Sequence, residues 1–243
     1  MSELHVYGVV PADARPKIES ADVRRVVHRD VAALVSDVDS GDLAAARLLR
    51  VHWKVLDEAA ASATVLPVRF GTVMADEQAV VDDFLAASYD GLIAELGAMA
   101  GKVQLTVKGF FEEESLMRGV VEASPEIARL REHVRSVPEA AAYYERIQLG
   151  QMVAGEVERA RERDTETVLA RLEPLAVATN VEPLARIDAA VNAAFLVERE
   201  RVEEFSSAVT ELGHELAGRV KLRYVGPLPP YSFTGESMSA GAA

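Results

Sequence analysis

The sequence predicts an α+β protein built from two domains, and three observations support this. The chain has 243 residues, 49% of them hydrophobic, which is more than a single pair of packed layers needs for its core. Short strand-like segments alternate along it with segments whose hydrophobic residues recur every three or four positions. A strand signal at residue 102 opens a complete second set of strands and helices. We therefore expect separate cores for residues 1–100 and 101–236.

The N-terminal segments predict three strands. Residues 3–10 mix hydrophobic and other residues in the manner of a short strand, and Pro11 ends it because proline cannot donate a hydrogen bond to a neighbouring strand. The segment 22–38 contains two further strands, VRRVV and VAALVSDV. A turn at residues 28–30 between them predicts a hairpin.

Two helices and one short strand complete the predicted N-terminal domain. A helix begins near Asp42, which can serve as its N-cap. Its hydrophobic stripe consists of Ala46, Leu49, Trp53, Leu56 and Ala60. The strand VLPVRF at 65–70 contains Pro67, which favours an edge or bulged position. The second helix spans 76–99 with Asp76 as N-cap, and we expect Trp53 and Phe84 to lie in the core.

A strand and a long helical region open the second domain. KVQLTVKGFFEE at 102–113 alternates hydrophobic and polar residues, which is typical of a strand. The helical insertion 114–173 is divided at Pro125, where Ser124 can act as N-cap, and again at Pro138. The stripe of the last helix runs through Tyr143, Ile147, Gly150, Ala154, Val157, Ala160, Val168 and Leu172.

The order of the remaining elements predicts a ferredoxin-like fold for the second domain. Strand patterns at 175–180 and 185–197 are followed by a helix at 200–217 and a strand at 220–225. Strand, helical region, strand, strand, helix, strand is the split βαβ order of that fold. The first domain matches no named motif and is predicted only as α+β. The small and polar residues 237–243 predict a flexible tail.

Composition excludes several classes of partner. The net charge of −13 repels nucleic acid and an anionic membrane surface. The absence of cysteine excludes disulfides and thiolate ligands or nucleophiles. The N-terminus does not resemble a secretory signal, and no hydrophobic run approaches the ~20 residues that cross a bilayer. We expect a cytoplasmic protein.

A search for catalytic and metal-binding motifs predicts no catalytic, cofactor-binding or metal-binding residue. The five histidines are scattered, and no two have the spacing that builds a metal site on a helix. The acidic run DVDSGD at 37–42 lacks the final acid of a calcium loop, since Leu48 occupies that position. Phosphate-binding and nucleophile-elbow patterns are absent, and paired acids such as Asp82 and Asp83 fit a solvated face.

Two segments are candidates for contacts. Val68, Arg69 and Phe70 are partner-contact candidates, because an Arg within a hydrophobic strand needs either an acidic partner or an opening to solvent. The alternative interpretation is an Arg69 paired within its own fold.

The segment VGPLPPYSF predicts an intramolecular strap that docks in a groove between the domains. Its prolines lower the entropy cost of docking. Tyr231 and Phe233 are the expected anchors, because they point to one side of an extended chain. Its alternative is an exposed ligand for another protein.

Several blocks together resemble the gas vesicle protein F/L family. They are LHVYGVV near the N-terminus, HWKVLDEAAASATVLPVRFGTVM at 52–74, KVQLTVKGFF, NVEPLARIDAAVNAAFLVERERVEEF at 180–205, and VGPLPPYSF at 225–233. The resemblance covers nearly the whole chain and implies two domains with a ferredoxin-like second half. It further implies a non-enzymatic accessory or minor structural protein of gas vesicle assembly. Such a protein binds the hydrophobic shell subunit and other accessory proteins and limits premature aggregation of the shell subunit. It implies no cofactor and a location in the cytoplasm or at the gas vesicle.

Two other functions are compatible with the predicted fold. Ferredoxin-like domains often bind metabolites at sheet edges, so a small-ligand regulatory module is the alternative function. An uncharacterised hydrolase or transferase is a third hypothesis, which a pocket with convergent polar groups and displaced pKa values would favour.

Overall fold

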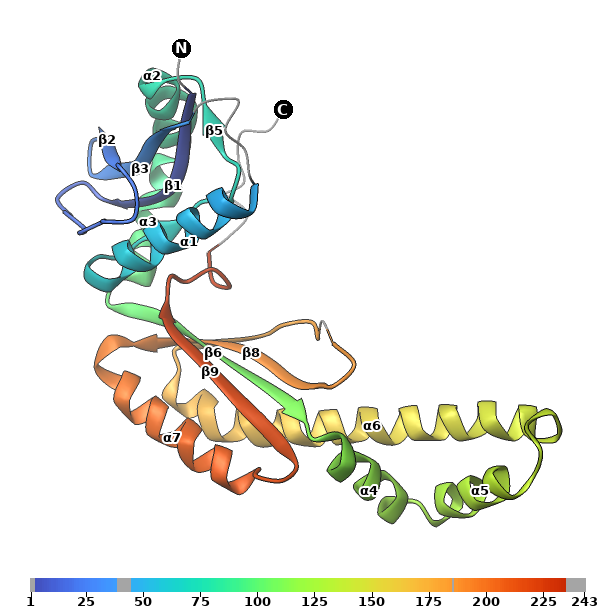
Figure 1. Ribbon diagram of the computed structural model, residues 1–243. Helices are drawn as coiled ribbons and strands as arrows, with labels where there is room; N and C mark the ends of the chain where they lie inside the picture. The colour runs from blue at the N-terminus through green and yellow to red at the C-terminus, as the bar shows by residue number, and fades with distance from the viewer. Residues whose placement is uncertain (1–2, 39–44, 185, 235–243) are drawn as a thin grey trace. The chain divides into compact units, whose positions relative to one another are not determined.

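The computed structural model describes residues 3–38, 45–184 and 186–234. The chain divides into two compact units. Unit 1 comprises Met1–Leu105, Leu196–Glu200 and Gly226–Ala243, and unit 2 comprises Thr106–Phe195 and Arg201–Val225 (Figure 1). The predicted N-cap Asp42 and the predicted tail 237–243 lie outside the described residues. That residues 1–100 and 101–236 form independent folding units stays a prediction.

Unit 1 is built around an antiparallel sheet with the order β2-β3-β1-β4, in which β5 also pairs with β1. Its strands are β1 (Glu3–Pro11), β2 (Arg24–His28), β3 (Val31–Val38), β4 (Leu66–Pro67) and β5 (Val73–Met74). The predicted hairpin is confirmed, since His28 pairs with Val31 across a turn in which Arg29 has a φ of 52°. β1 is the central strand and is buried along most of its length.

Helices cover both faces of this sheet, which explains why β1 shows no alternation between buried and exposed residues. They are α1 (Ala45–Ser62), α2 (Glu77–Ala79), the π-helical segment η1 (Val80–Ala86) and α3 (Tyr89–Met99). One face packs on α1 through Val55, Leu56 and Ala59. The other packs on η1 and α3 through residues that include Phe84 and Leu92.

Two expectations for these helices need correction. The single helix expected at 76–99 is interrupted by the π-helical η1 and a turn before Tyr89, although Asp76 caps its start as predicted by accepting a hydrogen bond from the Ala79 amide at 2.8 Å. Trp53 is 53% exposed, so its assignment to the core is wrong. The buried face of α1 lies one position away and begins at His52.

Unit 2 has the predicted ferredoxin-like topology. Its antiparallel sheet has the order β7-β8-β6-β9, with the first and third strands in the centre. The strands are β6 (Lys102–Phe111), β7 (Ala178–Val181), β8 (Ala189–Glu198) and β9 (Val220–Leu228). The strand predicted at 185–197 begins later than expected because Arg186–Asp188 belongs to a turn, which leaves Ile187 91% exposed.

The helices of unit 2 follow the predicted divisions. They are α4 (Glu113–Ala123), α5 (Pro125–Ser136), η2 (Glu139–Ala142), α6 (Tyr143–Leu172), η3 (Glu173–Leu175) and α7 (Val202–Glu215). The short η4 (Arg199–Arg201) precedes α7, and its first two residues belong to unit 1. Ser124 caps α5 through the Ile127 amide, with Pro125 in the first turn as predicted. α6 and α7 lie on one face of the sheet (Figure 1).

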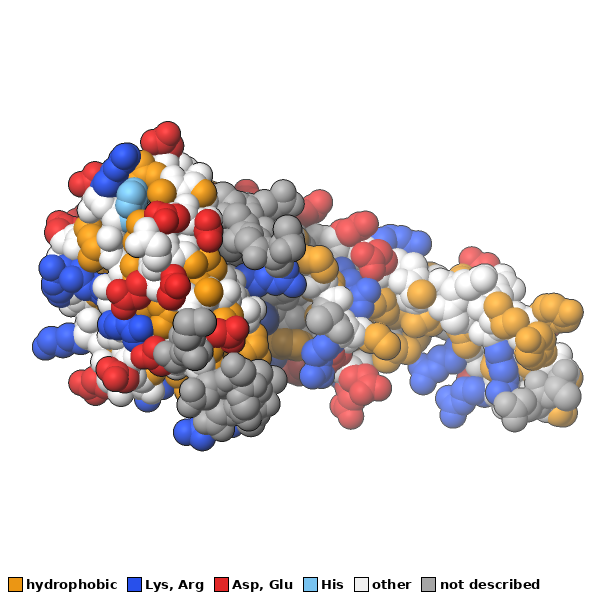
Figure 2. All heavy atoms as spheres, turned by 90° about the horizontal axis from the view of Figure 1, so that it is seen from above, with side chains coloured by type: hydrophobic (Ala, Val, Ile, Leu, Met, Phe, Trp, Pro, Cys, Tyr) orange, Lys and Arg blue, Asp and Glu red, His pale blue; other side chains and the backbone are white. Residues whose placement is uncertain are grey.

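The beginning of α6 does not bury its predicted stripe. α6 extends past the sheet, and its first turns lie beside α5 (Figure 1). Tyr143 and Ile147 are therefore exposed, as is the neighbouring Tyr144. Figure 2 shows hydrophobic side chains gathered at this end of the helix. The buried residues of α6 are Asp164, Val168 and Leu172, which lie where the helix crosses the sheet.

Candidate functional site

The segment that carries the partner-contact candidates runs along the outer edge of β1. β4 and β5 both pair with β1, and the Val68 amide donates a hydrogen bond to the Tyr7 carbonyl at 2.9 Å. Between the two strands the chain turns away from the edge. The Arg69 carbonyl accepts hydrogen bonds from the Thr72 amide at 3.2 Å and the Thr72 hydroxyl at 2.8 Å, and Gly71 has a φ of 88°. Gly71 closes the turn in the left-handed conformation, which glycine adopts without strain.

The three candidate residues differ in exposure. Val68 is buried, so its side chain supports the segment from beneath and offers no surface. Arg69 is exposed, and no carboxylate among the described residues pairs with its guanidinium. Phe70 is half-buried, and the next strand exposes Val73. We call Arg69, Phe70 and Val73 the edge surface.

A buried histidine pair lies beneath the edge surface. Nε2 of His5 is 2.9 Å from Nδ1 of His52, and Nε2 of His52 is 3.1 Å from the Val68 carbonyl oxygen. Because a carbonyl only accepts, His52 carries its proton on Nε2, and its Nδ1 accepts the proton of His5 Nε2. The ring of Phe70 packs edge-on against both imidazoles, at centroid distances of 5.8 Å from His5 and 5.5 Å from His52.

Burial holds both imidazoles in the neutral form. It lowers the pKa of His52 to about 4, and the neighbouring His5 lowers it further, while the hydrogen bond to Val68 acts in the opposite direction. Burial also lowers the pKa of His5. Sequence reasoning missed this pair because the two residues lie 47 positions apart. The packing of α1 on β1 brings the two imidazoles together.

The predicted strap lies against residues of unit 1. Pro229 and Pro230 are buried, and Phe233 packs on the same core as Phe84 and Leu92. The Ser232 amide donates to Oε1 of Gln104 at 2.8 Å. The segment is a turn and not the extended chain that we expected, since the Phe233 amide bonds back to the Pro230 carbonyl at 3.0 Å.

Tyr231 is the more exposed of the two predicted anchors. Burial raises the pKa of its phenol, and the Asp57 carboxylate adds to the shift. The proposed role of Tyr231 and Phe233 in stability stays a prediction.

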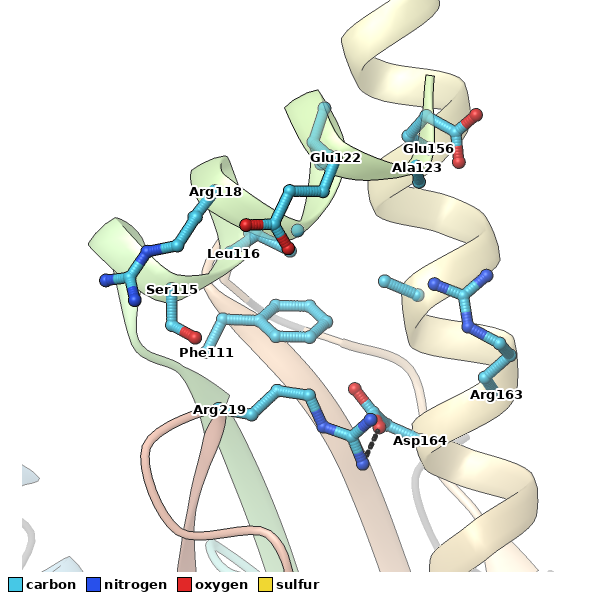
Figure 3. Close-up of a pocket in the computed structure, with 13 residues that line it drawn as sticks. Phe111, Ser115, Leu116, Arg118, Glu122, Ala123, Glu156, Arg163, Asp164 and Arg219 are labelled. Carbon is cyan, nitrogen blue, oxygen red and sulfur yellow. Dashed lines mark ion pairs between the residues drawn. The ribbon is translucent and has the colours of Figure 1, made fainter. Parts of the chain in front are cut away.

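Unit 2 contains a cavity of about 430 Å³ between α4, α6 and the end of β6 (Figure 3). The ring of Phe111 lines it between α4 and α6, and Glu122 reaches toward that ring from α4. Asp164 on α6 is only 2% exposed. Its Oδ1 lies 2.9 Å from a guanidinium nitrogen of Arg219, but the approach lacks the direction of a hydrogen bond.

The electrostatics of this cavity centre on Asp164. Burial raises the pKa of the Asp164 carboxyl, while the positive charges of Arg219 and Arg163 oppose that shift. A cavity of this size with a buried carboxylate can accommodate a small molecule that donates a hydrogen bond. Among residues 3–38, 45–184 and 186–234, no group of three or more histidines and acids is placed to hold a metal ion. No helix in the same ranges is both long and apolar enough to cross a membrane.

Comparison with known proteins gives consistent matches along the chain. Residues 3–235 match the gas vesicle synthesis protein GvpL/GvpF family. Gas vesicle protein F of a Streptomyces strain is 35% identical over 212 residues, which cover 87% of this chain and 87% of that protein. Gas vesicle protein F of Nostoc is 28% identical over 243 residues, 96% of this chain and 98% of that protein. The crystal structure of the gas vesicle protein GvpF from Anabaena is similar at a TM-score of 0.83 and 26% identity, over 97% of this chain and 99% of that one.

Proposed function

Since this chain belongs to the gas vesicle synthesis protein GvpL/GvpF family, we propose that it serves gas vesicle synthesis by binding the hydrophobic shell subunit and limiting its premature aggregation. The proposed role is one of assembly, with no catalysed reaction. Its partners are the shell subunit and other accessory proteins of the vesicle. It acts in the cytoplasm and at the growing gas vesicle.

The observation that carries the proposed contact is the edge surface. A hydrophobic subunit must be received by hydrophobic surface, because an acidic face alone leaves its side chains in water. Phe70 presents part of its ring to solvent, and Val73 on β5 is 41% exposed. Arg69 lies at the rim without a carboxylate partner among the described residues, so its guanidinium is available to a partner. Aromatic residues and arginine, here Phe70 and Arg69, are enriched at protein interfaces.

The turn is held in place from beneath, which favours binding. The Val68 carbonyl accepts from the buried His52, and Phe70 rests on both imidazole rings. A contact surface that is ordered before binding loses less entropy on association. The histidine pair therefore has a positioning role for the edge surface.

Co-purification from cells that produce the tagged chain and the shell subunit tests this contact. We expect Phe70→Ala to reduce the recovered shell subunit several-fold, since truncation of an aromatic residue at the centre of an interface costs about 2 kcal/mol or more, and we expect Arg69→Ala at the rim to reduce it less. Arg129→Ala is the matched control, because it removes an exposed arginine from α5 in unit 2. Unchanged recovery by folded Arg69 and Phe70 variants means that the edge surface is not the contact.

The cavity of unit 2 favours a second candidate function, a small-ligand regulatory module. Its carboxylate Asp164 is buried with an Oδ1 that lacks a hydrogen bond from any described donor, which a ligand with a donor group would satisfy. A thermal-shift screen of amines, amino acids and amides against the protein and its Asp164→Asn variant tests this. Stabilisation of the unsubstituted protein alone supports the second function, and no stabilisation by any compound removes it.

A further inference from the structure

The sheet of unit 2 has two different faces. A Cβ on Gly109 would meet the side chains of Val220, Val191 and Leu222, so these residues share one face. Tyr224, two residues beyond Leu222 on β9, places its hydroxyl 3.0 Å from Ser206 on α7, which identifies this face as the one that the helices cover. Side chains alternate along a strand. Lys108 and Phe110 of β6 and Arg223 of β9 therefore belong to the other face.

No described helix of unit 2 covers that second face (Figure 1). Its most distinctive feature is the half-buried ring of Phe110, which two guanidinium groups approach. The central carbon atoms of Arg186 and Arg223 each lie 5.6 Å from the ring centroid. Lys108 is exposed two positions earlier on the same strand. We call Lys108, Phe110, Arg186 and Arg223 the open face.

The cations of the open face are only partly neutralised. Arg186 binds Asp188 through two hydrogen bonds of 2.8 and 2.7 Å. No carboxylate of the described residues pairs with Lys108 or Arg223, and Lys221 adds a further exposed charge on β9. That no described carboxylate pairs with these two cations is notable, because the whole chain has a net charge of −13 and offers 39 acidic residues.

A small cavity lies beside the aromatic ring. Its volume is about 90 Å³, and its lining includes Lys108, Phe110, Leu184, Arg186 and Asn192. This space is too small for a cofactor and suits one aliphatic side chain. The open face thus combines an apolar recess with two cations, Lys108 and Arg223, that no carboxylate of the described residues pairs with.

We propose that the open face binds an acidic segment of another protein, whose carboxylates pair with Lys108 and Arg223 and whose aliphatic side chain fills the recess beside Phe110. Arginine provides a planar fork that matches a carboxylate, and the Phe110 ring fixes the orientation of that fork. This contact is separate from the edge surface and does not depend on the identity of the shell subunit as a partner.

The overall charge favours a polypeptide over a nucleic acid as the occupant. A nucleic acid carries a phosphate at every nucleotide and would extend beyond the few cations of this face over a chain with a net charge of −13. An acidic peptide segment needs only a few carboxylates at the correct spacing. Phe110 is also a single aromatic ring, whereas strands of nucleic acid are held by several stacked rings.

An NMR titration of the ¹⁵N-labelled full chain tests the proposal with the peptide Glu-Glu-Leu-Glu-Glu. We expect amide shifts that concentrate on β6 and β9 around Phe110 and Arg223. Arg223→Gln and Lys108→Gln should each weaken binding by about tenfold, as expected for the loss of a charge-assisted hydrogen bond. Lys17→Gln is the matched control, because it removes an exposed charge from unit 1.

Every outcome of this titration either supports or contradicts the binding of an acidic segment to the open face. The proposal is supported if the shifts are localised on β6 and β9, and if Arg223→Gln and Lys108→Gln weaken peptide binding while Lys17→Gln does not. The peptide Gln-Gln-Leu-Gln-Gln should then leave the spectrum unchanged. No shifts on β6 and β9, or equal weakening by Lys17→Gln, would overturn it. Tighter binding of oligothymidylate at the same residues would overturn the choice of a polypeptide as the partner.

Discussion

Acidification is expected to destabilise unit 1 through its buried histidine pair. The pKa of His52 is about 4 in the folded chain, against an ordinary value of 6.5. As the pH falls below 6.5, the unfolded chain takes up a proton that the folded chain excludes. The free energy of unfolding therefore decreases as the pH falls, and the loss levels off once His52 is also protonated in the folded chain near pH 4.

The expected loss can be worked from this shift. Between about pH 7 and about pH 5, His52 alone lowers the free energy of unfolding by about 2 kcal/mol. His5 adds to the loss, because burial lowers its pKa in the same direction. His52→Phe keeps an aromatic ring but removes the titrating group. The variant should start less stable by roughly 1–3 kcal/mol at neutral pH, since it leaves the Val68 carbonyl and His5 without a partner, and it should lose less stability with acid.

Urea unfolding followed by tryptophan fluorescence measures this effect within the correct unit. Trp53 is the one tryptophan of the chain and lies on α1 beside His52, so its emission reports on unit 1. His133→Phe is the control, because His133 is exposed on α5. If the unsubstituted protein and His52→Phe lose the same stability between the two pH values, the buried pair does not titrate as described.

Two further predictions concern the C-terminal segment and the division of the chain. The double substitution Tyr231→Ala with Phe233→Ala should lower the thermal midpoint by several degrees, since two partly buried aromatic rings each contribute up to about 1.5–3 kcal/mol. Unchanged stability with weaker partner binding would instead identify the segment as a ligand for another protein. Limited proteolysis should cut first near Ala100–Gly101, or where helices meet at Pro125 and Pro138, and first cuts within β8 would contradict separate folding units.

The strand order of unit 2 was predictable because local signals and topology agree. Ser124 followed by Pro125 marks a helix start by chemistry that needs no tertiary contact. Asp76 likewise caps its helix through its own side chain. The order of strands and helices after residue 102 then predicts the split βαβ arrangement, which the sheet order confirms.

The features that the sequence did not predict depend on contacts between residues distant in the sequence. Trp53 fits the hydrophobic period of α1, but the sheet faces the helix side that holds His52 and Leu56. Gln104 on β6 is polar yet buried for a similar reason, because the C-terminal segment lies against it and the Ser232 amide donates to its Oε1 at 2.8 Å. At the edge surface the sequence indicated Arg69 and Phe70, whereas the imidazoles beneath them become neighbours only through β1 and α1.

The proposed assembly role is tested most directly by the solubility of the shell subunit. Shell subunit produced alone and together with this chain would be compared by the fraction that stays in the supernatant after sedimentation. We predict that the chain raises this fraction and is recovered in complex with the subunit, and that Phe70→Ala raises it less. An unchanged soluble fraction, with no shell subunit bound to the folded chain, would contradict the account.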